Sequence, residues 1–68
     1  MISVTSSTVN RVGYVADALE LHVQFKSSAK IYVYEGVPPA VFERLLAAPS
    51  KGTFVNQQVK GTYAFHLA

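Results

Sequence analysis

The sequence predicts an α+β fold: a three-stranded antiparallel meander packed against one amphipathic helix and a second, short helix. Three observations support this class. Apolar and polar residues alternate along residues 19–26, the pattern of a strand with one buried and one solvated face. A second strand-forming run at residues 31–35 follows a polar turn, which together indicate a hairpin. Residues 38–48 begin with proline and carry their apolar side chains at helical spacing.

The N-terminal part supplies the first strand. Residues 1–8 are rich in Ser and Thr without periodicity, so we expect a flexible N-terminal tail ahead of a single domain over residues 9–68. Apolar side chains recur along residues 9–14, which predicts a short strand. Gly13 within this strand indicates a bulge or the close approach of another segment.

The strand at residues 31–35 is apolar on both faces. Tyr32 and Tyr34 point to one side, and Ile31 and Val33 point to the other. This pattern fits a central strand, or a strand whose second face meets a partner. We expect the tyrosines to pack against the neighbouring helix, with stacking on unpaired nucleic-acid bases as the alternative.

The helix at residues 38–48 has a single apolar stripe. Its members are Val41, Phe42, Leu45 and Leu46. Pro49 ends the helix, because the residue before a proline resists the helical conformation. The expected core consists of Leu21, Val23, Phe42 and Leu45.

A second helix is expected over residues 51–60, with Ser50 as its N-cap and Gly61 as its C-terminal stop. Residues 52–55 also fit a strand, so a strand remains the alternative there. Alternation over residues 63–67 indicates either a fourth strand or an apolar tail folded back on the core.

The composition describes a small domain with apolar surface to spare. The chain has 68 residues, of which 50% are apolar and 15% are charged. A domain of this size is only marginally stable alone, so we expect a homodimer or a tight partner of another kind. The chain has no cysteine, which excludes disulfides and cysteine-ligated metals. Neither a signal-peptide pattern nor a bilayer-spanning run is present, so we expect a cytoplasmic location.

No residue pattern indicates catalysis. His22 and His66 are the only histidines, and neither has a second ligand at a metal-binding spacing. Glu20 and Glu35 face each other across the hairpin as an ordinary surface pair. The serines lack a base that would activate them, and the glycines form no phosphate-binding loop. We therefore expect no enzymatic activity, no metal and no cofactor.

The C-terminal part is weakly basic. The net charge is +2, and residues 50–68 contain two lysines and no acid. If nucleic acid binds, the expected contacts are Lys51, Asn56 and Lys60, supplemented by Lys30. On a helix, Asn56 and Lys60 share one face, and Lys51 lies at the N-terminus, where free N–H groups favour an anion. The alternative is that these lysines are ordinary solvated residues.

Several short motifs together resemble one known family, the KTSC domain. The residues that carry the resemblance are Val12-Gly13-Tyr14, the alternating Leu19, Leu21, Val23 and Phe25, Tyr32-Val33-Tyr34, Val37-Pro38, Phe42, Leu45-Leu46, Ala48, Ser50, Gly52, Phe54, Asn56, Val59-Lys60 and Tyr63. This small domain is named for its place at the C-terminus of some lysyl-tRNA synthetases, and it also stands alone in bacterial and phage proteins. The resemblance implies the α+β fold predicted above.

The resemblance also implies a function class. Attachment to a synthetase points to a small non-enzymatic module that binds RNA or another nucleic acid. The alternative is a protein-interaction module, such as a phage or bacterial regulator that binds a host protein through an apolar surface. Lys60 stands where the family commonly has an arginine, which keeps the charge but removes the planar two-pronged donor.

Overall fold

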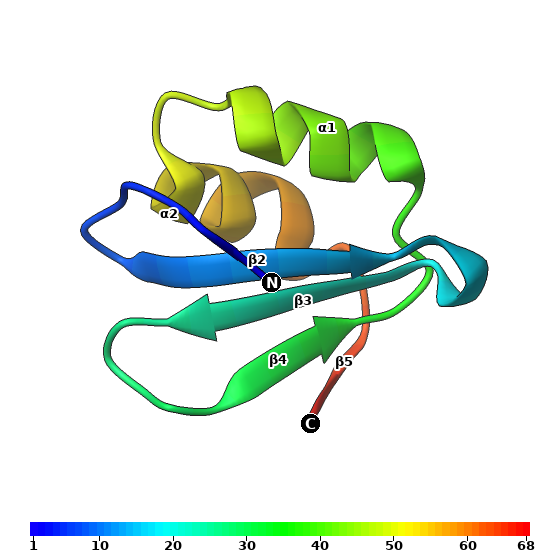
Figure 1. The fold of residues 1–68 in the computed structure, drawn as a ribbon. Coiled ribbons are helices and arrows are strands. Elements are labelled where there is room, and N and C mark those ends of the chain that lie inside the picture. Colours follow the sequence, from blue (N-terminus) through cyan, green and yellow to red (C-terminus); the bar gives the residue numbers. More distant parts are fainter.

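Five strands pair in chain order to form one antiparallel sheet (Figure 1). The computed structural model describes all 68 residues. The strands are β1 (Ile2–Ser3), β2 (Val9–Val15), β3 (Glu20–Phe25), β4 (Ile31–Tyr34) and β5 (Phe65–Leu67). The helical segments are the 3-10 turn η1 (Ala16–Ala18), α1 (Pro39–Ala47), α2 (Lys51–Phe54) and the π-helical turn η2 (Val55–Val59), which continues α2.

The predicted α+β class and its central meander are confirmed. Strands β2, β3 and β4 pair as an antiparallel meander in which Leu21 lies between Tyr14 and Tyr34. The sheet is wider than the predicted three strands. β5 pairs with β4 at one edge, which confirms the fourth strand rather than a folded-back tail. At the other edge, the segment expected to be a tail contributes β1, whose Ile2 pairs with Val12.

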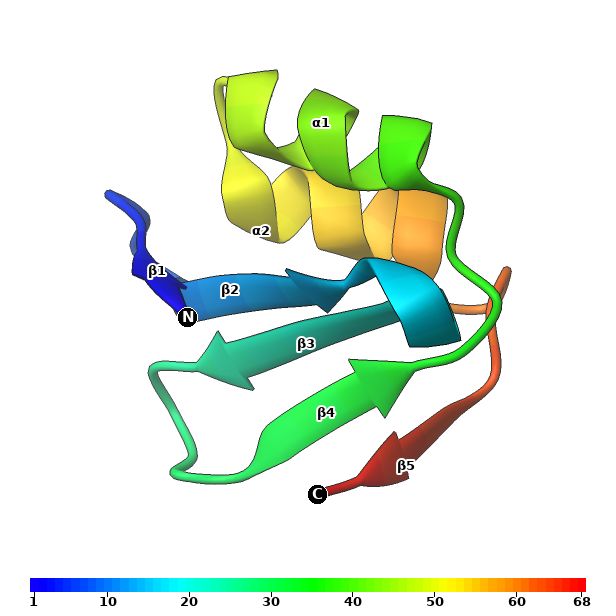
Figure 2. The same cartoon turned by 45° about the vertical axis from the view of Figure 1, so that its right-hand side comes forward.

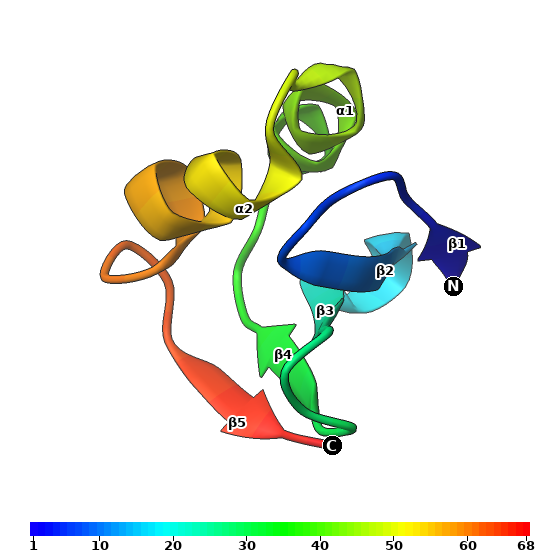
Figure 3. The same cartoon turned by 90° about the vertical axis from the view of Figure 1, so that its left-hand side faces the viewer.

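All helices longer than one turn cover the same face of the sheet (Figure 2). Viewed along the strands, the sheet curves around the α2 segment, with α1 on the β2 side and β5 at the opposite edge (Figure 3). The helix-facing side chains come from alternate positions of β3 and β4, as the sequence pattern predicts. On β2, an irregularity between Val9 and Arg11 places Val9 and Val12, three residues apart, in the same core. None of the helices is long and apolar enough to cross a membrane.

The core lies between the helices and the sheet. It consists of Val9, Val12, Leu21, Val23, Phe25, Tyr34, Val37, Val41, Leu45, Val55 and Val59. Three of the four predicted core residues are confirmed, because Leu21, Val23 and Leu45 are fully buried. Phe42 is the exception. It is only half-buried and stacks on Tyr14 with ring centroids 5.2 Å apart at the rim of the core.

The second helix forms where it was predicted, but its register changes partway. Ser50 is the N-cap, and its hydroxyl accepts a hydrogen bond from the Thr53 backbone N–H at 3.3 Å. From Val55 onward the helix widens into η2, where the Lys60 N–H donates to the Val55 carbonyl at 2.8 Å. This register keeps Val55 and Val59 fully buried. Gly61 follows with a φ of 79°, the left-handed conformation expected of a helix stop.

Candidate nucleic-acid interface

The four residues predicted to touch nucleic acid lie on two parts of the fold, three along or just after the α2–η2 segment and Lys30 at the β3–β4 turn. Lys51 begins α2 and Lys60 follows η2, so a helical stretch of about 13 Å separates them. Asn56 is exposed between them, and Lys30 is exposed at the β3–β4 turn. The Lys60 ammonium turns toward the sheet and lies 5.0 Å from the centroid of the Phe25 ring. The π register accounts for this direction. The Lys60 N–H bonds to the Val55 carbonyl, so Lys60 lies one helical turn after Val55, whose side chain points into the core.

The structure instead groups Lys51 with a lysine that the sequence analysis did not select. A hollow of about 600 Å³, called here the basic hollow, lies beside the N-terminal loop. Its lining residues are Val4, Thr5, Ser6, Ser7, Lys26, Pro49, Ser50 and Lys51. Two ammonium groups and four hydroxyl groups thus face one space, and no acidic residue lines it.

Backbone and side-chain hydrogen bonds hold this hollow in shape. The Lys26 N–H donates to the Thr8 carbonyl at 2.8 Å, which ties the end of β3 to the N-terminal loop. The Ser6 hydroxyl accepts from the N–H groups of Thr8 and Val9. The Lys51 ammonium donates to the Ala48 carbonyl at 2.6 Å. An ammonium has three donors, so two remain for an anion.

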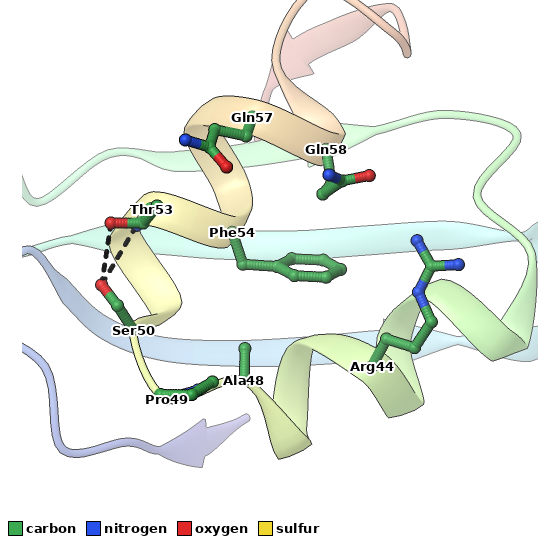
Figure 4. Close-up of a pocket in the computed structure, with 8 residues that line it drawn as sticks. All are labelled: Arg44, Ala48, Pro49, Ser50, Thr53, Phe54, Gln57 and Gln58. Atoms are coloured by element: carbon green, nitrogen blue, oxygen red, sulfur yellow. Dashed lines mark hydrogen bonds between the residues drawn. The ribbon is translucent and has the colours of Figure 1, made fainter.

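A second hollow of about 450 Å³, called here the Phe54 hollow, lies between α1 and the α2 segment (Figure 4). Its lining residues are Arg44, Ala48, Pro49, Ser50, Thr53, Phe54, Gln57 and Gln58. The Phe54 ring lies in the middle of it, with the Arg44 guanidinium carbon 5.9 Å from the ring centroid. The only side-chain hydrogen bonds between its lining residues join Ser50 and Thr53. The Arg44 guanidinium and the two glutamine amides are therefore available to a ligand.

No carboxylate neutralises the basic residues. The only ion pairs in the molecule join His22 to Glu20 at 3.2 Å and His66 to Glu35 at 2.7 Å. All six lysines and arginines are therefore without an acidic partner. The histidine pairs stand on the face of the sheet away from the helices. No group of three His, Cys, Asp or Glu side chains is arranged to hold a metal ion.

The tyrosines of β4 pack rather than face solvent. Tyr34 is 1% exposed and belongs to the core, which agrees with the expected packing against the helices. Burial, with a smaller contribution from Tyr32, raises the pKa of the Tyr34 hydroxyl above its ordinary value of 10.0. Phe65 from β5 covers this pair, with its ring centroid 5.2 Å from Tyr32 and 5.7 Å from Tyr34, and remains 53% exposed.

Comparison with known proteins places the chain in a family. The KTSC domain family profile matches residues 5–63, which is most of the chain. The chain therefore belongs to the KTSC domain family. The crystal structure of a KTSC domain protein from Yersinia pestis superimposes with a TM-score of 0.93 at 31% identity, covering 98% of this chain and 93% of that one.

Curated relatives fall into two settings. A protein from Tsukamurella paurometabola is 45% identical over 60 residues and is covered to 88% of its length. An uncharacterized protein from Stutzerimonas stutzeri is 41% identical over 59 residues and is covered to 82%. A lysine–tRNA ligase from Nostoc punctiforme is 37% identical over 59 residues, but this match spans only 10% of the ligase. The domain thus occurs both in proteins of similar length and as part of a larger one.

The residues that the sequence analysis missed carry a recognisable spacing. Gln57 and Gln58 follow Phe54 by three and four positions, and Ala48 follows Arg44 by four, so each set shares one helix face. That spacing was visible in the sequence. The placement of Lys26 and Lys51 around one hollow could not be seen in the sequence, because it depends on how the N-terminal loop packs against α2.

Proposed function

We propose that this KTSC domain is a small non-enzymatic module that binds single-stranded nucleic acid, with RNA as the expected ligand. The observation that supports this most is the basic hollow, where Lys26 and Lys51 face one space without an acidic neighbour. Lysine is a compact charge that attracts phosphate, and hydroxyl groups add hydrogen bonds to phosphate oxygens. The lysine–tRNA ligase among the relatives carries tRNA in its name, which is consistent with RNA as the ligand.

The two lysines define how binding responds to salt. Each phosphate contact on a single strand contributes about −0.7 to the slope of log K against log salt. Lys26 and Lys51 together give a slope of about −1.4. Binding is therefore weak at physiological salt and measurable at low salt.

The first prediction tests the basic hollow with a fluorescently labelled single-stranded RNA in an anisotropy titration at low salt. We expect the Lys26→Ala/Lys51→Ala variant to bind more weakly than the parent and to reduce the salt slope by about 1.4. The matched control is Lys30→Ala/Lys60→Ala, which removes the same charge elsewhere on the surface. It should lose less affinity, because these lysines stand outside the hollow.

Two results would count against this function. The first is no detectable binding by the parent at low salt. The second is an equal loss in both double variants, which would show that net charge alone, rather than the hollow, governs binding.

A second candidate function rests on a different surface. Phe65 and Leu67 of β5 are 53% and 46% exposed, and β5 is an edge strand with no lysine, arginine, acidic residue or proline. Such an edge presents unpaired backbone groups that another strand can join. A protein partner, a second copy of this chain included, fits this surface better than nucleic acid does.

A further inference from the structure

The basic hollow and the Phe54 hollow are neighbours. Pro49 and Ser50, which lie between α1 and α2, line both of them. One surface therefore carries two lysines on one side of Pro49 and Ser50, called here the ridge, and an aromatic ring with an arginine on the other side. The basic hollow alone accounts for phosphate binding and leaves the second hollow without a role.

The Phe54 hollow has the chemistry of a base-binding surface. Bases in single strands stack on aromatic rings and on arginine guanidinium planes. Phe54 supplies the ring and Arg44 the guanidinium, whose central carbon lies 5.9 Å from the ring centroid. Base edges carry hydrogen-bond donors and acceptors side by side, and the amides of Gln57 and Gln58 can pair with either kind. No acidic side chain lines the hollow to repel a nearby phosphate.

We propose that the two hollows together hold one unpaired nucleotide, with its base in the Phe54 hollow and its phosphate in the basic hollow. This inference rests on the proposed function. It adds recognition of the base to the binding of the phosphate. The base must be unpaired, because a base stacked within a duplex cannot reach a side pocket without leaving the helix.

The shape of the ridge fits this division. Ser50 is exposed on the ridge, and its hydroxyl already bonds to Thr53 on the Phe54 side. Lys51, the next residue, lines the basic hollow and is absent from the lining of the Phe54 hollow. Consecutive residues thus face the two hollows, as the sugar that joins a base to its phosphate requires. The Phe54 hollow, at about 450 Å³, is within the range of small-ligand sites.

The test compares a labelled RNA decamer with an abasic strand of the same length and charge, by anisotropy at low salt. The parent should bind the RNA about 5- to 150-fold more tightly than the abasic strand, the range that follows from stacking of one base. Phe54→Leu keeps an apolar side chain but removes the ring, so it should abolish this difference and leave the salt slope unchanged. Gln57→Ala/Gln58→Ala changes only exposed residues and should reduce the difference without affecting stability.

The outcomes separate this inference from the proposed function. Equal binding of RNA and abasic strand by the parent, with the salt slope intact, would overturn the inference and leave the function standing. No binding of either strand would overturn both. Competition by adenosine monophosphate identifies the source of the nucleotide. If adenosine monophosphate displaces the labelled RNA at the same concentration as unlabelled RNA does, the ligand is a free nucleotide. If it does so only at large excess, the ligand is a nucleotide within a strand.

Discussion

At Gly52, α2 packs closely against Thr8 in the loop before β2. A Cβ atom built there would lie 2.9 Å from Thr8 Cβ and 3.0 Å from the Thr8 hydroxyl oxygen. Real Cβ atoms do not approach a branched side chain this closely, so the backbone would have to shift. Glycine therefore allows α2 to rest against the loop before β2, which is also the loop that closes the basic hollow.

We expect Gly52→Ala to lower the free energy of unfolding by up to about 2 kcal/mol. Overpacking costs about 1–3 kcal/mol, and the better helix propensity of alanine returns about 1 kcal/mol. Urea denaturation measures the change. The control is the same substitution in a Thr8→Gly background, where the obstructing Cβ is gone and alanine should be neutral or stabilising. A loss of equal size in both backgrounds would show that the Thr8 contact is not the cause.

The Tyr34 hydroxyl makes stability depend on pH in the alkaline range. Its pKa is raised in the folded state by burial and by Tyr32. As pH rises above about 10, the unfolded chain releases this proton while the folded chain retains it. The unfolded state then binds fewer protons, so the free energy of unfolding falls with pH. Below pH 9 both states keep the proton, and this group contributes no pH dependence.

The corresponding experiment compares the parent with Tyr34→Phe in urea denaturation from pH 8 to pH 11. The two proteins differ only in the Tyr34 hydroxyl, so the difference between the two curves isolates the contribution of that group. We expect this difference to stay constant up to pH 9 and then to change in favour of Tyr34→Phe. A constant difference up to pH 11 would mean that burial does not perturb this hydroxyl.

At the scale of elements, the sequence predicts the presence and the ends of the α2 segment but not its π register. Ser50, the spacing of Val55 and Val59, and Gly61 predict a helix and its ends, because capping and periodicity are local properties. The π register of η2 depends on how the valines reach the core, which is a tertiary effect. The direction of Lys60 toward Phe25 follows from that register, so it could not be predicted.

The apolar stripe of α1 shows the same limit. Val41 and Leu45 are buried, whereas Phe42 is half-buried and Leu46 is 38% exposed. Helical spacing identifies the apolar side of the helix but not which half of the stripe meets the sheet. The position of α1 toward β2 decides this, and it brings Phe42 onto the Tyr14 ring.

Strand β5 carries the prediction of self-association. Pairing of β5 with β5 of a second copy would satisfy the free edge and shield Phe65 and Leu67 from water. We expect a dimer at high micromolar concentration in sedimentation velocity, and we expect Leu67→Lys to shift it to the monomer. Val15→Lys is the matched control, because Val15 is similarly exposed, at 42%, but lies on β2. A parent that stays monomeric would leave only a foreign partner for this edge.

On the scale of the whole molecule, charge is divided between the two ends of the sheet. Asp17, Glu20 and Glu35 lie where β2 ends, β3 begins and β4 ends. Lys26 and Lys30 lie at the opposite turn, the end at which the basic hollow forms. The sequence shows the excess of lysine after residue 50, but only the antiparallel order of the strands collects the acids at one end. Half of the candidate site was thus accessible from sequence, and the other half required the fold.

The order of the strands has a consequence for how the chain folds. β2, β3 and β4 are joined by short turns, whereas the β4 residue Val33 pairs with His66, and α1, α2 and η2 lie between them in the chain. Closing that long loop costs more entropy than closing a hairpin. The meander and helices should therefore assemble first, with β5 docking after the rate-limiting step.

In stopped-flow experiments, Phe65→Ala should speed unfolding and leave the folding rate nearly unchanged, whereas Val23→Ala should slow folding. Because β5 joins last, it should also leave first, so its edge of the sheet opens while the rest of the fold persists.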